Sequence, residues 1–543
     1  MKLGTIQFDE ELFKKQLRGD MKDDWFVDPV RFQDMMDGKL VDKLIAHNYD
    51  HNDGKYEALE RDLFNIPKSN FTLRYALETG LPDRLLFHTL TAELVPLYDP
   101  LLGPTIYSHR YDHTAKTHKY LFKKGVGAWN DFIGSVKSAL APGKFLLSTD
   151  LTNYYEHIEL TRLKAQLIHM LPELKVESDE KGRARVLIDL LFSSLPKWTF
   201  NEKRGLPQNR DASSFLGNIY MVPVDQAMAK YGYGKAYFRY MDDIKIVCDS
   251  RWEARLALKR LILALRDQEL SVNAKKTVIA DANDEKSISD CLQHVSETIT
   301  YIDSVWKTNS PAQILPVLPM LRDYMLELME KGDYESKAFR FCINRLYTLC
   351  LCPTLSIPAQ YLDPITPRII AGLDAMPAST DQLCKFLRAA PVADDHLTLI
   401  AEFLEDPARC IYNWQNFHLW ILLTDKKFIS KSLLEYARKV VSVDKDTPTR
   451  AGATLYLGAT GDSIDKELIA TRFGTLSTFL GQRLAVIGLH EVPFSPLIKD
   501  HVKSHLRGDL IGCYTAMHKK PGTYCLPLES VNLGEETLEE MPS

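Results

Sequence analysis

The chain has 543 residues, of which 45% are hydrophobic and 26% charged, and its formal net charge is −5. This length exceeds what one hydrophobic core supports, so we expect two or three domains of an ordinary globular protein. No run of 18 apolar residues predicts a membrane span, and the N-terminus lacks the apolar segment of a signal peptide. Nine scattered cysteines without CxxC spacing are typical of a reducing cytoplasm, and not of a zinc site or a disulfide framework.

Residues 1–143 mix helical periodicity with loops and contain one basic stretch, 109–124, "HRYDHTAKTHKYLFKK". Tyrosine and phenylalanine alternate there with lysine and arginine. This mixture can hold phosphates and stack bases, which indicates a nucleic-acid contact. Since the net charge is negative, the argument is local, and a solvated basic face remains the alternative interpretation.

Residues 144–280 alternate between apolar runs and amphipathic segments. The run "KFLLSTDLT" at 144–152 predicts a short strand that ends in Asp150, and a helix follows over 158–171. Residues 205–226 predict a turn that leads into a helix. The expected elements further along are two strands in 237–248, a helix over 253–269 with Ala254, Leu258, Leu261, Ile262 and Leu265 on one face, and a turn and strand over 270–279.

Two adjacent aspartates, Asp242 and Asp243, interrupt the apolar run "YFRYMDDIKIVCD" at 237–249. If the flanking strands form a hairpin, Met241 and Asp242 lie at its tip. Two buried like charges are costly, and a divalent cation with oxygen ligands, above all Mg²⁺, relieves that cost. Asp150, at the end of another strand, supplies a third carboxylate. Two such ions support in-line displacement at phosphorus, whereas an isolated Asp-Asp pair also fits a solvated turn.

Four segments occur in an order that resembles motifs A to D of reverse transcriptases. They are "LSTDLTNYYEHI", "GLPQNRDASSFLGN", "YMDD" and "LSVNAKKT", and together they cover about residues 145–280. The resemblance implies an α/β (α+β) right-hand polymerase fold, with palm and fingers built around an antiparallel sheet. It also implies an RNA-directed DNA polymerase, a nucleotidyltransferase that uses dNTPs.

The resemblance assigns roles to individual residues. Asp150, Asp242 and Asp243 would hold two Mg²⁺ ions, or Mn²⁺ in their place, with the first two doing most of the binding. Tyr155 occupies the position of an aromatic steric gate that excludes a ribose 2′-hydroxyl, while Tyr154 is expected in the core. Lys276 matches the motif D lysine, a candidate general acid, although a surface lysine is the alternative interpretation.

Further substrate contacts follow from the same resemblance. Arg110 lies where the fingers contact the incoming triphosphate, and planar arginine suits bidentate phosphate binding. Lys116 is a second candidate for this contact. Gln208 is expected against the template or the nascent base pair. Leu151, directly after the motif A aspartate, completes the predicted substrate-binding set.

The motif B segment departs from the family pattern, which reads Pro-Gln-Gly followed by small residues. Here Asn209 replaces the glycine, and Asn is among the best residues for a positive φ, so the turn can survive. Arg210 and Asp211 add bulk and charge where the family is small. The departure argues against ordinary copying of long RNA.

After residue 300 the sequence predicts mostly helices, which we assign to a C-terminal domain over 300–520. Stacked helical pairs of the HEAT type are one candidate arrangement, although no repeat period is regular. The acidic end, 521–543, predicts a flexible tail. The expected domains are therefore 1–143 with the fingers, 144–299 as the palm, 300–520 as the helical domain, and the tail.

No retroviral-type RNase H, His/Asn endonuclease block or zinc cluster is evident. The helical region, "YSHR" and "LFKKGVGAWNDF" resemble the abortive-infection and related phage-defence reverse transcriptases of bacteria. This resemblance implies a bacterial cytoplasmic protein, an associated RNA or a DNA product, priming from a Tyr or Ser hydroxyl, and a homo-oligomer or partner protein. A retron or group II intron enzyme, and a non-catalytic RNA-binding scaffold with a relic palm, are the alternatives.

Overall fold

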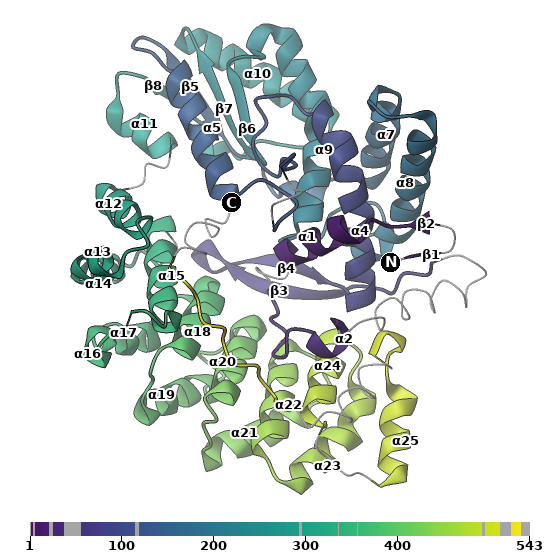
Figure 1. Ribbon diagram of the computed structural model, residues 1–543, viewed down its shortest axis with the longest axis vertical. Coiled ribbons are helices and arrows are strands. Elements are labelled where there is room, and N and C mark those ends of the chain that lie inside the picture. The colour runs from purple at the N-terminus through teal and green to yellow at the C-terminus, as the bar shows by residue number, and fades with distance from the viewer. Residues whose placement is uncertain are drawn as a thin grey trace.

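A four-stranded antiparallel sheet organises the palm, a name that we use for residues 144–292 (Figure 1). Its strands are β5 (Phe145–Thr149), β6 (Tyr237–Tyr240), β7 (Asp243–Cys248) and β8 (Val278–Asp281), in the order β6-β7-β5-β8. Strands β5, β6 and β7 are mostly apolar and almost entirely buried, as expected for strands that are covered by helices, whereas the edge strand β8 is partly exposed. The strands and helices predicted from the sequence between 144 and 280 are confirmed.

The computed structural model describes residues 2–3, 6–20, 25–36, 56–114, 119–292, 296–334, 336–355, 357–490, 495–510 and 523–533. Two short strands, β1 (Lys2–Leu3) and β2 (Ile6–Gln7), precede a hairpin of β3 (Asp62–Lys68) and β4 (Thr72–Glu78). The helices of this half are α1 (Glu10–Asp20), α2 (Gln33–Met36), α4 (Leu81–Tyr98), α5 (Gly125–Ala139), α6 (Tyr154–His157), α7 (Leu160–Met170), α8 (Ser178–Trp198), α9 (Asp211–Met228), α10 (Arg251–Asp267) and α11 (Glu285–Cys291).

The C-terminal half is helical, as the sequence predicts, and lies below and beside the palm in Figure 1. Several of its helices begin at a Ser, Thr or Asp whose side chain accepts a backbone N–H, which satisfies donors that the first turn leaves open. Its helices are α12 (Glu297–Trp306), α13 (Pro311–Ile314), α14 (Leu318–Glu330), α15 (Lys337–Leu351), α16 (Ala359–Leu362), α17 (Thr366–Ala371), α18 (Thr380–Ala389), α19 (Asp394–Glu405), α20 (Asn413–Asp425), α21 (Lys431–Val441), α22 (Pro448–Thr460), α23 (Ser463–Arg472), α24 (Phe479–Gly488) and α25 (Pro496–His505).

Two hydrophobic cores exist, and the boundary between them does not follow the chain. One core fills the palm and the helices around it. The second fills the helical region, yet it includes Phe26, Val30 and the β3–β4 residues Phe64, Ile66 and Ala76. Described N-terminal residues therefore contribute to both cores.

The junction between the N-terminal segment and the helical region contains a buried ion network. Arg483 of α24 donates to Asp28 at 2.6 Å and to both Asp34 oxygens at 2.6 Å. Its side chain is 1% exposed. Burial alone would lower the pKa of Arg483, but the two carboxylates outweigh it and raise that pKa well above its usual value.

Residues 523–533 form an ordered strap where the sequence predicted a flexible tail. The Leu526 N–H donates to the Pro29 carbonyl at 2.9 Å, and the Val531 N–H donates to Leu351 at 3.2 Å. Glu529 pairs with Arg31, and Leu533 is buried in the second core. The strap is ordered because its apolar side chains are buried between the N-terminal segment and helix α15. In the described part of the chain, every helix is too short or too polar to cross a membrane.

Candidate active site

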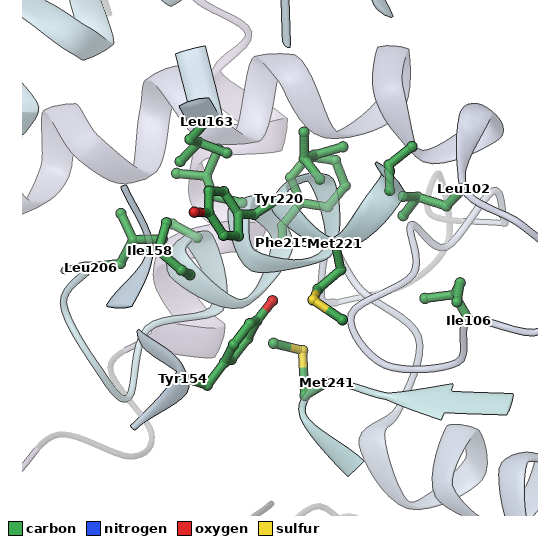
Figure 2. Packing of buried hydrophobic residues seen from close by; sticks show 14 of the residues in the cluster. Leu102, Ile106, Tyr154, Ile158, Leu163, Leu206, Phe215, Tyr220, Met221 and Met241 are labelled. Atoms are coloured by element: carbon green, nitrogen blue, oxygen red, sulfur yellow. The ribbon is translucent and has the colours of Figure 1, made fainter. Parts of the chain in front are cut away.

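The tip of the β6–β7 hairpin carries the aspartate pair. Tyr240 pairs with Asp243, and Met241 and Asp242 form the two-residue turn, as the sequence predicts. Met241 has φ +53°, a conformation that bulky residues rarely adopt. Its side chain is buried and lies beside Met221 and Tyr154 in Figure 2, so packing holds the strained turn in place.

Arg239 stabilises the same turn through hydrogen bonds, and this role was not predicted from the sequence. The fully buried guanidinium donates to Asp225 of α9 at 2.9 and 2.7 Å, and to Asn218 at 2.8 Å. A further N–H donates to the Met241 carbonyl at 3.1 Å. An arginine inside the apolar run "YFRY" was the available signal, because a buried charge requires a partner.

Asp150 lies immediately after β5, next to the hairpin tip. The β5–β7 register pairs Thr149 with Ile244, which brings the end of β5 to the start of β7. The Asp150 carbonyl accepts the Asn273 N–H at 2.7 Å, so the motif D loop fixes this end of the strand. The Asp150 and Asp242 carboxyl groups are within hydrogen-bonding reach. Burial, together with the charge of Asp150, raises the pKa of Asp242 to about 8.

Asp243 has a cationic partner. Lys245 Nζ lies 2.5 Å from its carboxylate and 2.9 Å from Ser148 Oγ. Burial raises the pKa of Asp243, while the charge of Lys245 opposes that rise. Of the three predicted metal ligands, Asp243 is thus the one that pairs with Lys245, a second residue that sequence reasoning missed.

Lys276 lies at the end of a short 3-10 helix, η6 (Ala274–Lys276), that follows α10. Its Nζ lies 2.5 Å from Asp150 Oδ2, and its side chain is mostly exposed. Burial would lower the pKa of Lys276, but the hydrogen bond and charge of Asp150 raise it. The ammonium group thus lies beside the carboxylate pair of Asp150 and Asp242.

Asp150 and Asp242 are the two carboxylates of the site that suit a divalent cation. Among the described residues, no three His, Cys, Asp or Glu side chains are arranged to hold a metal ion together. Asp150 and Asp242 nevertheless provide two hard oxygen donors whose mutual repulsion a cation would relieve. Because Mg²⁺ in nucleotide enzymes commonly uses one or two carboxylates plus substrate phosphates, this pair fits it.

Tyr155 lies in α6 beside the site. Its hydroxyl is 2.8 Å from Ser214 Oγ of α9, a contact that fixes the ring. Burial raises its pKa, and the nearby Asp242 adds to the rise. Tyr154 is a core residue, as predicted, and its hydroxyl donates to the Gly217 carbonyl at 2.6 Å. Gln208 is half-buried and lies 3.4 Å from Glu156.

The charges of motif B are neutralised inside the fold. Asn209 has φ +57°, which confirms the predicted positive-φ turn. Arg210 is buried and pairs with Glu78 at 2.8 Å. Asp211, the first residue of α9, lies 3.2 Å from His109 Nε2. The unusual Asn-Arg-Asp sequence therefore connects the motif B turn to strand β4 and to the 106–112 loop.

Three further predicted substrate residues have other placements. Arg110 donates to Asp99 at 2.7 Å and to the Gly103 and Ile106 carbonyls, so its guanidinium stabilises its own loop. Leu151 is 3% exposed and bridges to Val272, so its side chain belongs to the core. Lys116 lies outside the described residues.

The helical region approaches the β6–β7 hairpin at Lys337 of helix α15. Lys337, the first residue of α15, places its Nζ 3.9 Å from the Trp129 ring centroid. The Trp129 ring in turn meets Tyr240 edge-on, with centroids 5.1 Å apart. Burial lowers the pKa of Lys337 to about 8, against the opposing charge of Asp243.

One family of known proteins matches the region that contains the palm. Residues 101–303 match the family described as reverse transcriptase (RNA-dependent DNA polymerase). The match identifies this segment as a reverse-transcriptase domain with a palm-and-fingers fold. No curated protein matches the sequence.

Two solved structures of telomerase are similar to parts of this chain. One is telomerase from Candida albicans with a fragment of telomeric RNA, with a TM-score of 0.32, 12% identity, and coverage of 67% of this chain and 66% of that one. The other is apo telomerase from Candida tropicalis, with a TM-score of 0.31, 12% identity, and coverage of 79% and 73%. The match thus spans just under two thirds of the first telomerase chain.

Proposed function

We propose that the protein is a Mg²⁺-dependent DNA polymerase that adds dNTPs to a 3′-hydroxyl and acts in bacterial antiphage defence. The observation that carries the polymerase chemistry is the carboxylate pair of Asp150 and Asp242, on neighbouring strand ends and beside Lys276. Lys276 offsets part of the charge of this pair, but burial and Asp150 still raise the pKa of Asp242, as expected where a cation and a substrate bind.

Asp150 and Asp242 would hold Mg²⁺, or Mn²⁺ in its place, and the Asp243–Lys245 pair would support the second of the two expected ions. When bound, such ions lower the pKa of the attacking hydroxyl and neutralise charge on the leaving oxygen. Tyr155, fixed by Ser214, would limit the space beside the sugar and so exclude a 2′-hydroxyl. Lys276 would donate a proton to the leaving pyrophosphate.

The polymerase proposal is tested with purified protein, labelled dNTPs and Mg²⁺. The substitution Asp242→Asn should reduce incorporation by roughly three orders of magnitude, because several kcal/mol of transition-state stabilisation are lost. Asp249→Asn is a matched control, since Asp249 lies just past the opposite end of β7 and its side chain is 82% exposed. Full incorporation by the Asp242→Asn protein would contradict the proposed site.

The defence role rests on the helical region joined to the palm and on the resemblance of "YSHR" and "LFKKGVGAWNDF" to phage-defence enzymes. Phage plating on bacteria that express the protein should show resistance, and Asp150→Asn should abolish it. Resistance that survives this substitution would support a scaffold with a relic palm. Retroelement genes beside the coding sequence would support a retron or group II intron enzyme.

The nucleic-acid partners and the primer belong to the same proposal. We expect an associated RNA or the DNA product as the bound nucleic acid, and a Tyr or Ser hydroxyl as a primer. A second copy or a partner protein completes the expected assembly. Sequencing the DNA made in cells identifies the template, and mass spectrometry of the protein identifies a covalent nucleotide adduct. Product with a free 5′ end would contradict priming from a side chain.

A further inference from the structure

Helix α10 presents an aromatic and basic stripe to solvent. The α10 stripe, as we define it, consists of Trp252, Arg255, Leu256, Lys259, Leu263 and Arg266, all exposed. Spacings of three and four residues place them on one face of the helix. The opposite face, with Ala254, Ala257, Leu261 and Leu265, is buried in the palm core. One side of α10 therefore holds the fold together, and the other has no partner within the described chain.

The stripe contains an unusually exposed aromatic ring. Trp252 is 75% exposed, and the Arg255 guanidinium lies 4.8 Å from its ring centroid. The same combination recurs beside the stripe, where Arg260 lies 4.9 Å from the ring of Tyr231, a residue that is 45% exposed. Large aromatic side chains and arginines dominate binding surfaces, and single-stranded nucleic acids use both for stacking.

The positive charge of α10 is not balanced locally. The helix carries Arg251, Arg255, Lys259, Arg260 and Arg266 against Glu253 and Asp267, in a chain whose net charge is −5. No ion pair joins any of these five cations to a carboxylate among the described residues. Uncompensated cations interleaved with open rings match phosphates and unpaired bases. An acidic protein would satisfy the cations but would leave the repeated ring and guanidinium pairs without a specific role.

The stripe runs toward the catalytic end of the palm. From residue 252 to residue 266 the helix rises about 21 Å, enough to follow a few nucleotides of an extended strand. The loop after α10 leads to Asn273, whose N–H donates to the Asp150 carbonyl. Trp252 lies at the other end, just after β7. A strand held along the stripe would therefore lie on the outer surface of the palm and lead toward the carboxylates.

We propose that the α10 stripe binds an unpaired stretch of RNA outside the catalytic site. Bases would stack on Trp252 and Tyr231, and Arg255, Lys259 and Arg266 would contact phosphates. The choice of RNA rests on the reverse-transcriptase class of the domain. The binding itself does not depend on the proposed polymerase chemistry.

The test measures binding of a labelled oligo(U) of about 12 nucleotides to the full-length protein carrying Asp242→Asn, without dNTPs. Adding Trp252→Ala should weaken binding roughly tenfold, the effect of losing one stacked base. The pair Arg255→Glu and Lys259→Glu should also reduce the dependence of affinity on salt, by about 0.7 per lost phosphate contact. The pair Lys431→Glu and Lys439→Glu on α21 is the matched control, with the same charge change at exposed positions.

A second readout uses tryptophan fluorescence. Trp252 is exposed, whereas the other six tryptophans are buried or half-buried. Oligo(U) should quench the emission that iodide also quenches, and Trp252→Phe should remove both effects. Unchanged affinity in the α10 variants, equal loss in the α21 control, or equal binding of single-stranded DNA or duplex would overturn the proposal. It would also be overturned if Trp252→Ala altered the oligomeric state but not RNA affinity, which would make the stripe a protein interface.

Because no synthesis takes place in this assay, the two proposals fail separately. Wild-type protein that binds oligo(U) through the stripe but incorporates no dNTP would contradict only the proposed function. Active protein whose α10 variants bind normally would contradict only the RNA site.

Discussion

The palm and the helical region both bury charge, but they balance it differently. Beside the second core, Arg483 lies between Asp28 and Asp34 with its hydrogen bonds satisfied. In the palm, Asp150 and Asp242 face each other, and burial raises the pKa of Asp242 to about 8. Charges that neutralise one another hold two segments together. Buried carboxylates that repel one another, such as Asp150 and Asp242, are typical of a site that binds a ligand.

Replacing one palm carboxylate by a neutral amide is the strongest test of this difference between the palm and the junction. Asp242→Asn should lower dNTP incorporation by roughly three orders of magnitude and yet raise the unfolding midpoint of the metal-free protein by about 2 °C or more. The two effects have opposite signs for one reason. Repulsion between Asp242 and Asp150 destabilises the metal-free fold, whereas the same two carboxylates would bind the cation that incorporation requires. Thermal unfolding in chelator, compared with Asp249→Asn, measures the second effect. A lower unfolding midpoint for Asp242→Asn would contradict destabilising repulsion between Asp150 and Asp242.

At the junction between the N-terminal segment and the helical region, removing a buried charge should destabilise the fold. Arg483→Met leaves Asp28 and Asp34 buried without their cation, so the free energy of unfolding should fall by about 3–5 kcal/mol. Arg368→Met is the control, because Arg368 pairs with Glu330 at an exposed site and should change it by less than about 1 kcal/mol. Urea denaturation of both variants gives the comparison. Similar losses would show that the junction network is no more structural than a surface pair.

Asp62 is another buried acid, and its carboxylate accepts the Phe479 N–H at 2.8 Å. Its titration should make the stability of the fold depend on pH. Burial raises the pKa of Asp62 to about 6, against the opposing charge of Arg507. An acid whose folded pKa exceeds its unfolded pKa stabilises the fold at low pH, and this contribution is lost as the pH rises from about 4 to 6.

Asp62→Asn should remove about 2–3 kcal/mol of that decline, since each pKa unit corresponds to 1.36 kcal/mol. Parallel urea titrations at the two ends of this pH window measure the difference between the proteins. A wild-type protein that gains stability over the window relative to the variant would contradict the assigned direction.

The smallest effect is expected where the helical region touches the palm. Lys337→Ala removes the cation from Trp129 and should lower incorporation by a few fold, about 0.5–1 kcal/mol for a cation–π contact of this kind. Lys337→Arg should retain most activity, whereas Lys331→Ala, at an exposed lysine just after α14, should change nothing. Steady-state kinetics should show the change in kcat rather than in KM for dNTP. An unchanged kcat would mean that the helical region does not support the catalytic hairpin.

Local patterns in the sequence predicted the local structure well. Apolar runs predicted strands β5 to β8, and the Asp-Asp pair predicted the tip of the hairpin. Asn209 was expected at positive φ because few other residues tolerate it, and its φ is +57°. These features depend on neighbours within a few residues, which the sequence displays directly.

Contacts between distant segments were not predictable from one sequence. Arg239 finds Asp225 on another element, and Lys245 lies between Asp243 and Ser148 on the adjacent strand. Arg110 has the right chemistry for a triphosphate, yet Asp99 and two carbonyls occupy its donors. In each case the partner is chosen by tertiary packing, which leaves no periodic signal.

The shared second core has a consequence for how the protein is made. Strands β3 and β4 leave the ribosome early, but Phe64 and Ile66 pack against helices that are synthesised hundreds of residues later. Trp414 in turn donates to the Trp25 carbonyl at 2.8 Å, and the strap at 523–533 closes over Pro29. Since folding during synthesis proceeds from the N-terminus, this hairpin must wait with its apolar face exposed. A newly made molecule therefore completes its N-terminal structure only after the C-terminal helices have been synthesised.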